Sequence, residues 1–313
     1  MNPSDKRKSE YRKMKAAFEW NDWPVPAPQS FHHWTLARQV DHLVAAREAE
    51  PDLGFMARLM ALCALPRTNP GRRKEYVRAN GPYTLVMTAG YNNRLPYGNL
   101  PRLLLAWIST EAVRTQRRTL ILGRSLSEFM RKVGIFDDGG AMRRRLRSQI
   151  DRLFGCQIEL IEERRDVKRF IASRIADRGE FWWDVKRPDA PVLWDSKIEL
   201  GEKFFREIIH RPVPLDMNIL KAIKRSTLGL DLYMWLSYRT FTLKKVTAIR
   251  WRDLYLQFGV APSKTNDKLT VNNFRKKSLR ELKKIKTAWG DLRYDTARGV
   301  LIIMPSVPSI PPS

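Results

Sequence analysis

Residues 270–286 read TVNNFRKKSLRELKKIK, a stretch in which apolar and basic positions separate at the period of an α-helix. At 100° per residue the apolar side chains share one arc: Val271, Phe274, Leu282 and Ile285, with Leu279 at its edge. The opposite arc holds polar and basic side chains: Asn272, Asn273, Lys276, Lys277, Arg280, Lys283 and Lys284. A basic helix face standing alone is most often a solvated flank. Set on a core, the same face has the form of a helix that reads DNA.

The charge of the whole chain favours a polyanionic partner. Its 313 residues include 58 Lys and Arg against 33 Asp and Glu, a formal net charge of +25. With 43% hydrophobic residues and ten Trp, the chain is expected to fold into a compact body. The excess charge destabilises such a body by self-repulsion unless an anion binds. Nucleic acid is therefore the first candidate partner, and a membrane surface is the second.

Other features argue against a membrane and against an oxidising compartment. No apolar run approaches the roughly 18 residues of a spanning helix, and residues 1–10 (MNPSDKRKSE) lack the apolar core of a signal peptide. Cys63 and Cys156 give no disulfide framework and no CxxC metal site. We therefore expect a cytoplasmic protein with no membrane partner.

A helix, a turn and a second basic helix also occur earlier in the chain. Residues 100–115 have a wide apolar face, and Ser125 is expected to cap a second helix that ends at Gly134. Residues 142–154 follow as an amphipathic helix whose polar side is rich in arginine: Arg143, Arg144, Arg145, Arg147 and Arg152. This is the order of a helix-turn-helix, in which the second helix lies in the major groove.

The block repeats further along the chain. Leu105-Ala106-Trp107 corresponds to Tyr233-Met234-Trp235, and Thr119-Leu120-Ile121 to Thr247-Ala248-Ile249, both at an offset of 128 residues. Ser125 corresponds to Asp253 as a helix cap, and residues 143–145 correspond to residues 275–277. Each unit is expected to close with a hairpin in the position of a wing, formed by residues 157–161 with 169–175 and by residues 289–294 with 299–304.

We therefore predict an α+β fold of two tandem winged-helix domains, helix-rich, with β-hairpin wings. The expected divisions are a basic N-terminal arm and Pro-rich linker (1–50), a first winged-helix domain (51–210), a second (211–304) and a Pro-rich tail (305–313).

Further elements are predicted between and around these blocks. Residues 35–50 and the apolar run 53–65 are predicted as helices, residues 83–88 as a strand, and residues 195–200 and 201–209 as a strand and a helix. Between the units lie Trp182, Trp183 and Trp194. We interpret these residues as core that joins the two domains rather than as base-stacking residues.

Several long motifs resemble those of the plasmid-encoded RepA replication initiators. They are LPRTNPG (65–71), NGPYTLVMTAG (80–90), LPYGNLPRLLLAWISTEAVRT (95–115), LSEFMRKVG (126–134), IELGEKFFREII (198–209) and LKAIKRSTLGLDLYMWLSYR (220–239). The resemblance runs from about Leu53 to Met304. It leaves the first 50 residues and the tail outside.

The resemblance implies a bacterial protein that binds direct repeats (iterons) in double-stranded DNA at a plasmid origin. It also implies opening of the adjacent duplex and recruitment of the host's replicative helicase and initiator proteins. A homodimer that represses its own gene would exchange with a monomer that initiates, which links the protein to plasmid copy control.

Within this framework we assign roles to the basic residues. Asn273, Lys277 and Arg280 are candidates for base reading, because asparagine pairs with adenine and Arg or Lys with guanine. Phosphate contacts are expected from Lys276, Lys283, Lys284, Arg143, Arg144, Arg145 and Arg147, of which Arg147 is also suited to base reading. The expected wings add sugar and phosphate contacts through Arg169, Arg174 and Arg298.

Enzymatic alternatives find little support in the sequence. A rolling-circle nicking enzyme needs a His-x-His metal pair, whereas His32 and His33 are adjacent. An ATPase needs a phosphate loop ending in Gly-Lys, and that dipeptide does not occur. We expect no catalysis, no cofactor and no metal. Two alternatives stay open: a winged-helix transcriptional repressor without an origin role, and a basic protein that binds RNA or membrane by charge alone.

Overall fold

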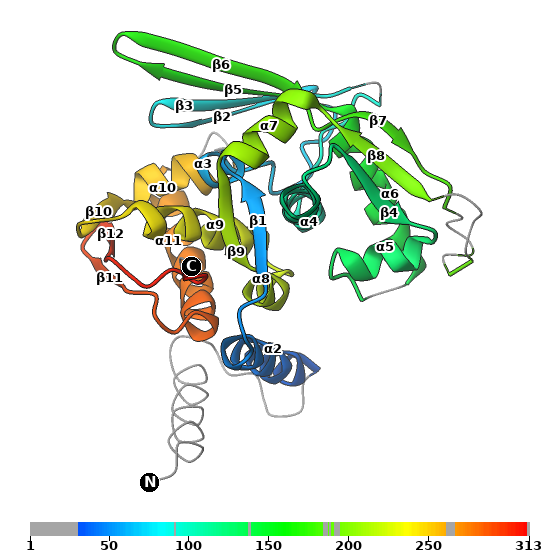
Figure 1. The fold of residues 1–313 in the computed structure, drawn as a ribbon. Helices are drawn as coiled ribbons and strands as arrows, with labels where there is room; N and C mark the ends of the chain where they lie inside the picture. The colour runs from blue at the N-terminus through cyan, green and yellow to red at the C-terminus, as the bar shows by residue number, and fades with distance from the viewer. Residues whose placement is uncertain are drawn as a thin grey trace.

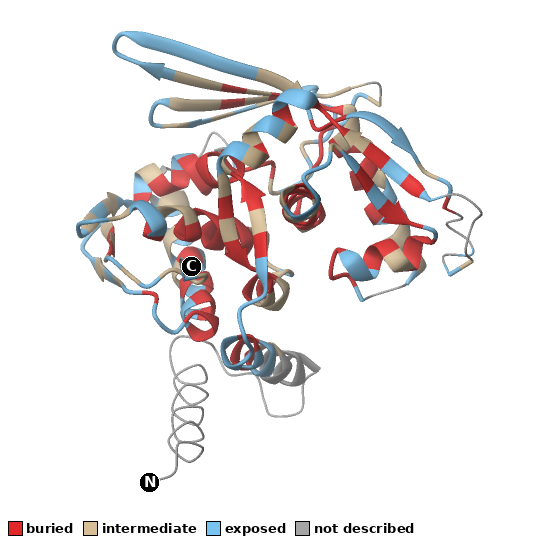
Figure 2. Ribbon diagram, viewed as in Figure 1, coloured by how far each residue is buried: buried red, intermediate tan, exposed pale blue. Residues whose placement is uncertain are grey.

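The computed structural model describes residues 31–90, 92–136, 139–183, 187, 189–190, 195–260 and 267–311. The expected arm at residues 1–30 and the interpretation of Trp194 lie outside this part of the chain. The fold mixes helices and strands around one connected hydrophobic core, with buried residues concentrated in the central helices (Figure 2). Among the described residues, no helix is long and apolar enough to cross a membrane.

A two-stranded sheet joins segments far apart in the sequence. Strand β1 (Leu53–Ala57) packs on α4 (Asn99–Thr115) and pairs antiparallel with β9 (Pro212–Asp216). The helix predicted over residues 53–65 is therefore wrong in its first half, and only α3 (Arg58–Leu62) is helical. Because nearly every residue here is buried, the sequence lacks the period that separates a strand from a buried helix.

Apart from a hairpin at residues 157–174 that is inserted after its last helix, the first unit is ordered helix, strand, helix, helix, strand, strand. Its elements are α4, β4 (Thr119–Gly123), α5 (Leu126–Lys132), α6 (Gly140–Gly155), β7 (Ala176–Glu180) and β8 (Ser196–Leu200), followed by α7 (Glu202–His210). The three strands form a sheet in the order β4-β8-β7. Ser125 Oγ accepts a hydrogen bond from Glu128 N at 3.1 Å, so the predicted helix cap is confirmed. The predictions for α4, β4, α6, β8 and α7 are confirmed as well.

The second unit repeats this order (Figure 1). After α8 (Met217–Ile223) come α9 (Thr227–Thr242), β10 (Thr247–Arg250), α10 (Trp251–Phe258), α11 (Asp267–Ala288), β11 (Tyr294–Ala297) and β12 (Val300–Ile303). The strand order β10-β12-β11 corresponds to β4-β8-β7.

Two predictions in the second unit are corrected. The N-cap of α10 is Arg250, and Asp253 instead lies in the first turn, where it accepts a hydrogen bond from Arg250 Nε at 2.9 Å. The strand predicted from Trp289 begins only at Tyr294. Trp289 is buried where α11 ends, and its indole donates to Val307 O at 3.0 Å.

A four-stranded sheet lies along the top of the molecule in the view of Figure 1. Its order is β2 (Glu75–Asn80), β3 (Tyr83–Thr88), β5 (Gln157–Arg164) and β6 (Val167–Arg174). The strand over residues 83–88 and the hairpin after α6 are confirmed, while β2 escaped prediction. The hairpin lies in a different sheet from β4, however, so β7 and β8, not β5 and β6, occupy the places of β11 and β12.

The N-terminal helix packs against the second unit. Helix α2 (Phe31–Glu48) contacts α11 and α8, and Val40, Leu43 and Val44 are buried. This helix falls within residues 1–50, expected as an arm and linker, yet Leu43 and Ala46 belong to the core. The domain boundaries themselves stay a prediction.

Candidate nucleic-acid interface

Helix α11 presents one polar and basic face between Asn272 and Lys283. Phe274, Leu282 and Ile285 are buried against the surrounding helices, among which are α9, α2 and α10. The polar side chains predicted on the opposite arc are exposed: Asn272, Asn273, Lys276, Lys277, Arg280 and Lys283. The helix therefore offers guanidinium, ammonium and amide donors on a rigid support, as base and phosphate recognition requires.

Lys284 departs from the expected exposed position. Its side chain is only 11% exposed, and its ammonium lies 3.1 Å from Glu281 Oε1. Glu281 in turn lies against the start of α9, since a Cβ built on Gly229 would come 2.9 Å from Glu281 Oε2. Tertiary packing therefore covers the basic arc at Lys284, which the helical period cannot reveal. A phosphate contact by Lys284 is not compatible with this burial.

Helix α6 carries the second basic face. Leu146, Ile150 and Leu153 are buried, whereas Arg144, Arg145 and Arg147 are exposed and Arg143 is half-buried. Arg145 Nη2 donates to Asn99 Oδ1 at 3.3 Å, so one guanidinium is steadied from α4.

One arginine of α6 has a structural position. Arg152 is buried, with Nη1 donating to Leu95 O at 3.3 Å and the guanidinium 5.1 Å from the centre of the Tyr97 ring. It holds the loop before α4 against α6 rather than facing a ligand.

The arginines predicted on the wings do not share one surface. Arg169 and Arg174 are five positions apart on β6, so they project from opposite faces of the four-stranded sheet. Arg298 is exposed in the tight turn between β11 and β12, beside Gly299 at φ +82°. The structure thus brings Arg298 to the tip of the second hairpin but separates Arg169 from Arg174.

The tryptophans between the units differ in environment. Trp183 is buried, its ring stacks on Phe129 at 4.9 Å, and its indole donates to Gly123 O at 3.2 Å. Trp182 is 50% exposed. Trp183 is therefore core, as interpreted, but these contacts lie within the first unit and do not join the two domains.

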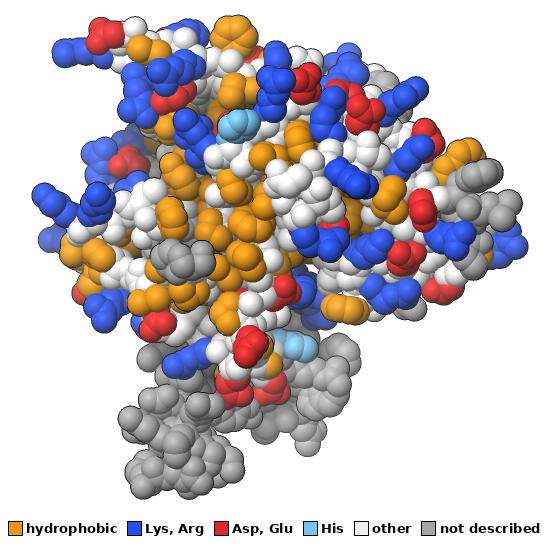
Figure 3. Space-filling model, viewed as in Figure 1, with side chains coloured by type: hydrophobic (Ala, Val, Ile, Leu, Met, Phe, Trp, Pro, Cys, Tyr) orange, Lys and Arg blue, Asp and Glu red, His pale blue; other side chains and the backbone are white. Residues whose placement is uncertain are grey.

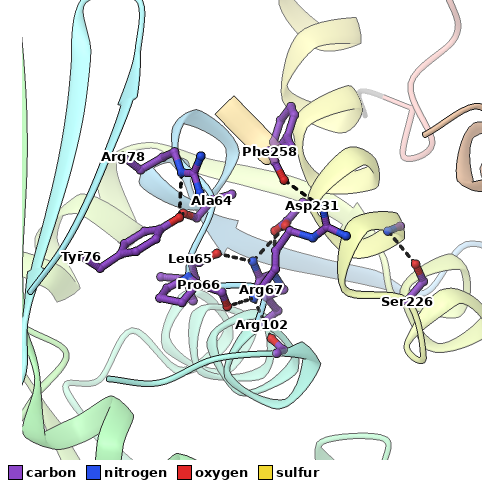
Figure 4. A network of polar contacts seen from close by, with 12 residues as sticks. Ala64, Leu65, Pro66, Arg67, Tyr76, Arg78, Arg102, Ser226, Asp231 and Phe258 are labelled. Carbon is purple, nitrogen blue, oxygen red and sulfur yellow. Dashed lines mark hydrogen bonds and ion pairs between the residues drawn. The ribbon is translucent and has the colours of Figure 1, made fainter. Parts of the chain in front are cut away.

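Sequence reasoning missed a group of arginines that hold the two units together (Figure 4). Arg67 Nη1 donates to Phe258 O at 3.1 Å, and Arg78 donates to Leu256 O and Gly259 O, both at 2.8 Å. Burial lowers the pKa of the Arg67 guanidinium. The presence of Arg67 within the LPRTNPG motif was the one available signal.

The described ranges contain no candidate metal site. No group of three or more His, Cys, Asp or Glu residues there is placed to hold a metal ion. Burial raises the pKa of both the Cys63 and the Cys156 thiols to about 12, so neither sulfur is a thiolate at neutral pH.

Comparisons with known proteins found a matching family model and solved structures of similar fold. Residues 95–253, more than half of the chain, match the family model described as "Plasmid encoded RepA protein". A solved structure described as "Crystal structure of SeMet derivatives of domain2 and domain 3 of RctB" is similar in fold, with a TM-score of 0.50 at 15% identity over 77% of this chain and 95% of that one. Another, "Crystal structure of the RctB domains 2-3, RctB-155-483", has a TM-score of 0.47 at 16% identity over 79% and 96%. A search of curated proteins found no match.

Proposed function

The chain belongs to the plasmid-encoded RepA family of plasmid replication proteins, and from this premise we propose that it initiates replication by binding repeated origin sequences in duplex DNA. The observation that carries the proposal is the exposed basic face of α11, set on a buried core. The net charge of +25 supports a polyanionic ligand.

We propose further that both units are winged-helix domains. The order of elements, which the two units share apart from the hairpin β5–β6 inserted in the first, and the matching sheets β4-β8-β7 and β10-β12-β11 support this interpretation. In such a domain the last helix before the terminal hairpin enters the major groove. These helices are α6 and α11, and two bound major grooves on one face of the DNA would lie about 10 bp apart.

The roles of individual side chains follow from exposure and donor geometry. Asn273, Lys277 and Arg280 are proposed to read bases from α11, with Lys276 and Lys283 on phosphates. On α6, Arg144, Arg145 and Arg147 are proposed to hold phosphates, with Arg143 at the margin. Arg298, exposed at the tip of the second hairpin, is proposed to contact the sugar-phosphate backbone.

In this proposal the protein is not an enzyme. Strand opening draws on the binding energy of several initiator molecules and on host proteins, including the replicative helicase, rather than on ATP hydrolysis. A monomer in exchange with a homodimer would adjust copy number by changing how much protein is free to initiate.

The test is the affinity for a duplex that carries the direct repeats beside this protein's own gene, compared with a scrambled duplex of equal length at two salt concentrations. We expect a preference on the order of a thousandfold or more. Equal affinity for the two duplexes would overturn sequence-specific binding. Adding the protein to an origin-bearing template in a host extract then separates an initiator from a repressor, because a repressor would bind the repeats without supporting replication.

A further inference from the structure

A hollow of about 400 Å³ lies between the hairpin β5–β6 and the segments that flank α7 and β9. Four arginines from three parts of the chain line it: Arg58, Arg211 and, from the hairpin itself, Arg164 and Arg169. Glu162 is the acidic residue of the lining, and Tyr83 and Val167 supply apolar surface. In Figure 3, Lys and Arg side chains lie at this hairpin end of the molecule as well as over the rest of the face shown.

Two of the four arginines in the hollow form ion pairs with carboxylates, and two do not. Arg164 Nε lies 2.6 Å from Glu162 Oε1, and Arg58 Nε lies 3.3 Å from Glu207 Oε1. Arg169 and Arg211 form no ion pair with any residue in the described part of the chain. Two guanidiniums, one from β6 and one from the turn after α7, are therefore available to a ligand.

The surroundings concentrate this positive charge. Glu162 has a lowered pKa, first because Arg164 hydrogen-bonds to its carboxylate and then because of the nearby charges of Arg164, Arg169 and Arg58. A concave surface lined by one sign of charge focuses the field and attracts counter-ions. A guanidinium fork suits phosphate oxygens in particular, since it can donate two parallel hydrogen bonds.

The size and lining of the hollow restrict the class of ligand that it can bind. A volume of about 400 Å³ lies in the range of small-molecule sites. Tyr83 and Val167 line the same hollow as the arginines, so the hollow offers apolar as well as cationic surface. A nucleotide combines the same two properties, with phosphate oxygens at one end and a flat base at the other.

We propose that this hollow, which we call the arginine pocket, binds the phosphate of a nucleotide, with Arg169 and Arg211 as its principal ligands. The nucleotide comes either from solution or from a nucleic-acid strand that crosses the pocket. The site is separate from α11 and adds a second anion-binding function to the proposed one.

The test uses the full chain and two fluorescent probes, a nucleoside triphosphate and a short single-stranded oligonucleotide, with inorganic pyrophosphate as competitor. The variants are Arg169→Ala, Arg211→Ala and the double variant. Lys168→Ala is the matched control, because Lys168 is a cation on the same strand that projects from the opposite face of the sheet.

We expect the double variant to bind at least one probe about tenfold or more weakly, and Lys168→Ala to stay within about twofold of the wild type. Loss confined to the triphosphate identifies a free nucleotide, and loss confined to the oligonucleotide identifies a strand. Arg169→Lys should fall between wild type and Arg169→Ala, because it keeps the charge and loses the fork. No binding of either probe to the wild type, or equal losses in the double variant and in Lys168→Ala, would overturn the pocket. Binding to the repeat-bearing duplex, measured in parallel, reports on α11 independently.

Discussion

Arg102 on α4 and Asp231 on α9 form a bidentate ion pair inside the protein. Arg102 Nε donates to Asp231 Oδ1 at 2.6 Å and Nη2 donates to Oδ2 at 2.9 Å, with the two side chains 0% and 2% exposed. The same guanidinium donates to three carbonyl oxygens: Leu65 O, Pro66 O and Gly98 O. One buried cation thus connects the helix that opens the first unit to its counterpart in the second.

Replacing Asp231 by Asn should destabilise the whole chain by about 3–5 kcal/mol, because the guanidinium of Arg102 would stay buried without a counter-charge. Urea unfolding measures this loss. Asp177→Asn is the control, since Asp177 pairs with Arg118 at 3.1 Å on the surface and is 48% exposed. Similar unfolding midpoints for the two variants would show that the buried pair does not hold the units together.

Glu128 on α5 should give a small, pH-dependent contribution to stability. Its carboxylate accepts from Lys132, 2.9 Å away, and from Arg124 N at 2.9 Å, and these bonds lower its pKa below the ordinary 4.5. Because the pKa is lower in the folded state, the ionised Glu128 stabilises the fold fully above pH 4.5. This stabilisation is lost as the pH falls through the folded-state pKa. Because the side chain is 38% exposed, we expect Glu128→Gln to cost on the order of half a kcal/mol at pH 7. Thermal unfolding from pH 7 to pH 3 should show the two proteins converge; a constant gap would contradict the linkage.

The sequence revealed those elements whose local pattern agrees with their tertiary setting. The helix over residues 100–115 and the Ser125 cap could be predicted because a period or a capping hydrogen bond is local information. Residues 53–57 could not, since their strand is defined by pairing with residues 212–216. The same holds for the hairpin after α6, which joins β3 instead of β4.

The residues of the candidate interface likewise divide into those that a local pattern could predict and those that it could not. The helical period placed Asn273, Lys277 and Arg280 correctly on an exposed face. It failed at Lys284, because the period describes one helix and carries no information about the neighbour that covers it. The arginine pocket could not be predicted from the sequence either, since Arg58 and Arg211 lie near Arg169 only in the folded chain.

Lys284→Met should leave DNA binding unchanged and reduce stability by about 2 kcal/mol, because Glu281 would stay largely buried without its partner. Chemical unfolding and duplex affinity, both measured well below the melting temperature, separate the two effects. The double variant Glu281→Gln/Lys284→Met removes both charges and should recover most of the loss. A clear fall in DNA affinity with unchanged stability would restore Lys284 as a phosphate contact.

Arg280→Ala and Lys283→Ala should differ in how they weaken DNA binding. Both side chains are exposed on α11, yet a guanidinium in the major groove can hydrogen-bond guanine bidentately, whereas an ammonium at the helix margin neutralises a phosphate. We expect Arg280→Ala to cost about 1–3 kcal/mol on the repeat-bearing duplex and little on a scrambled one. Lys283→Ala should weaken both duplexes alike and reduce the salt slope by about one. Fluorescence anisotropy titrations at several salt concentrations measure the affinity of each variant for each duplex and the salt slope. Equal losses on the two duplexes for Arg280→Ala would remove it from base reading, and a specific loss for Lys283→Ala would transfer that role to Lys283.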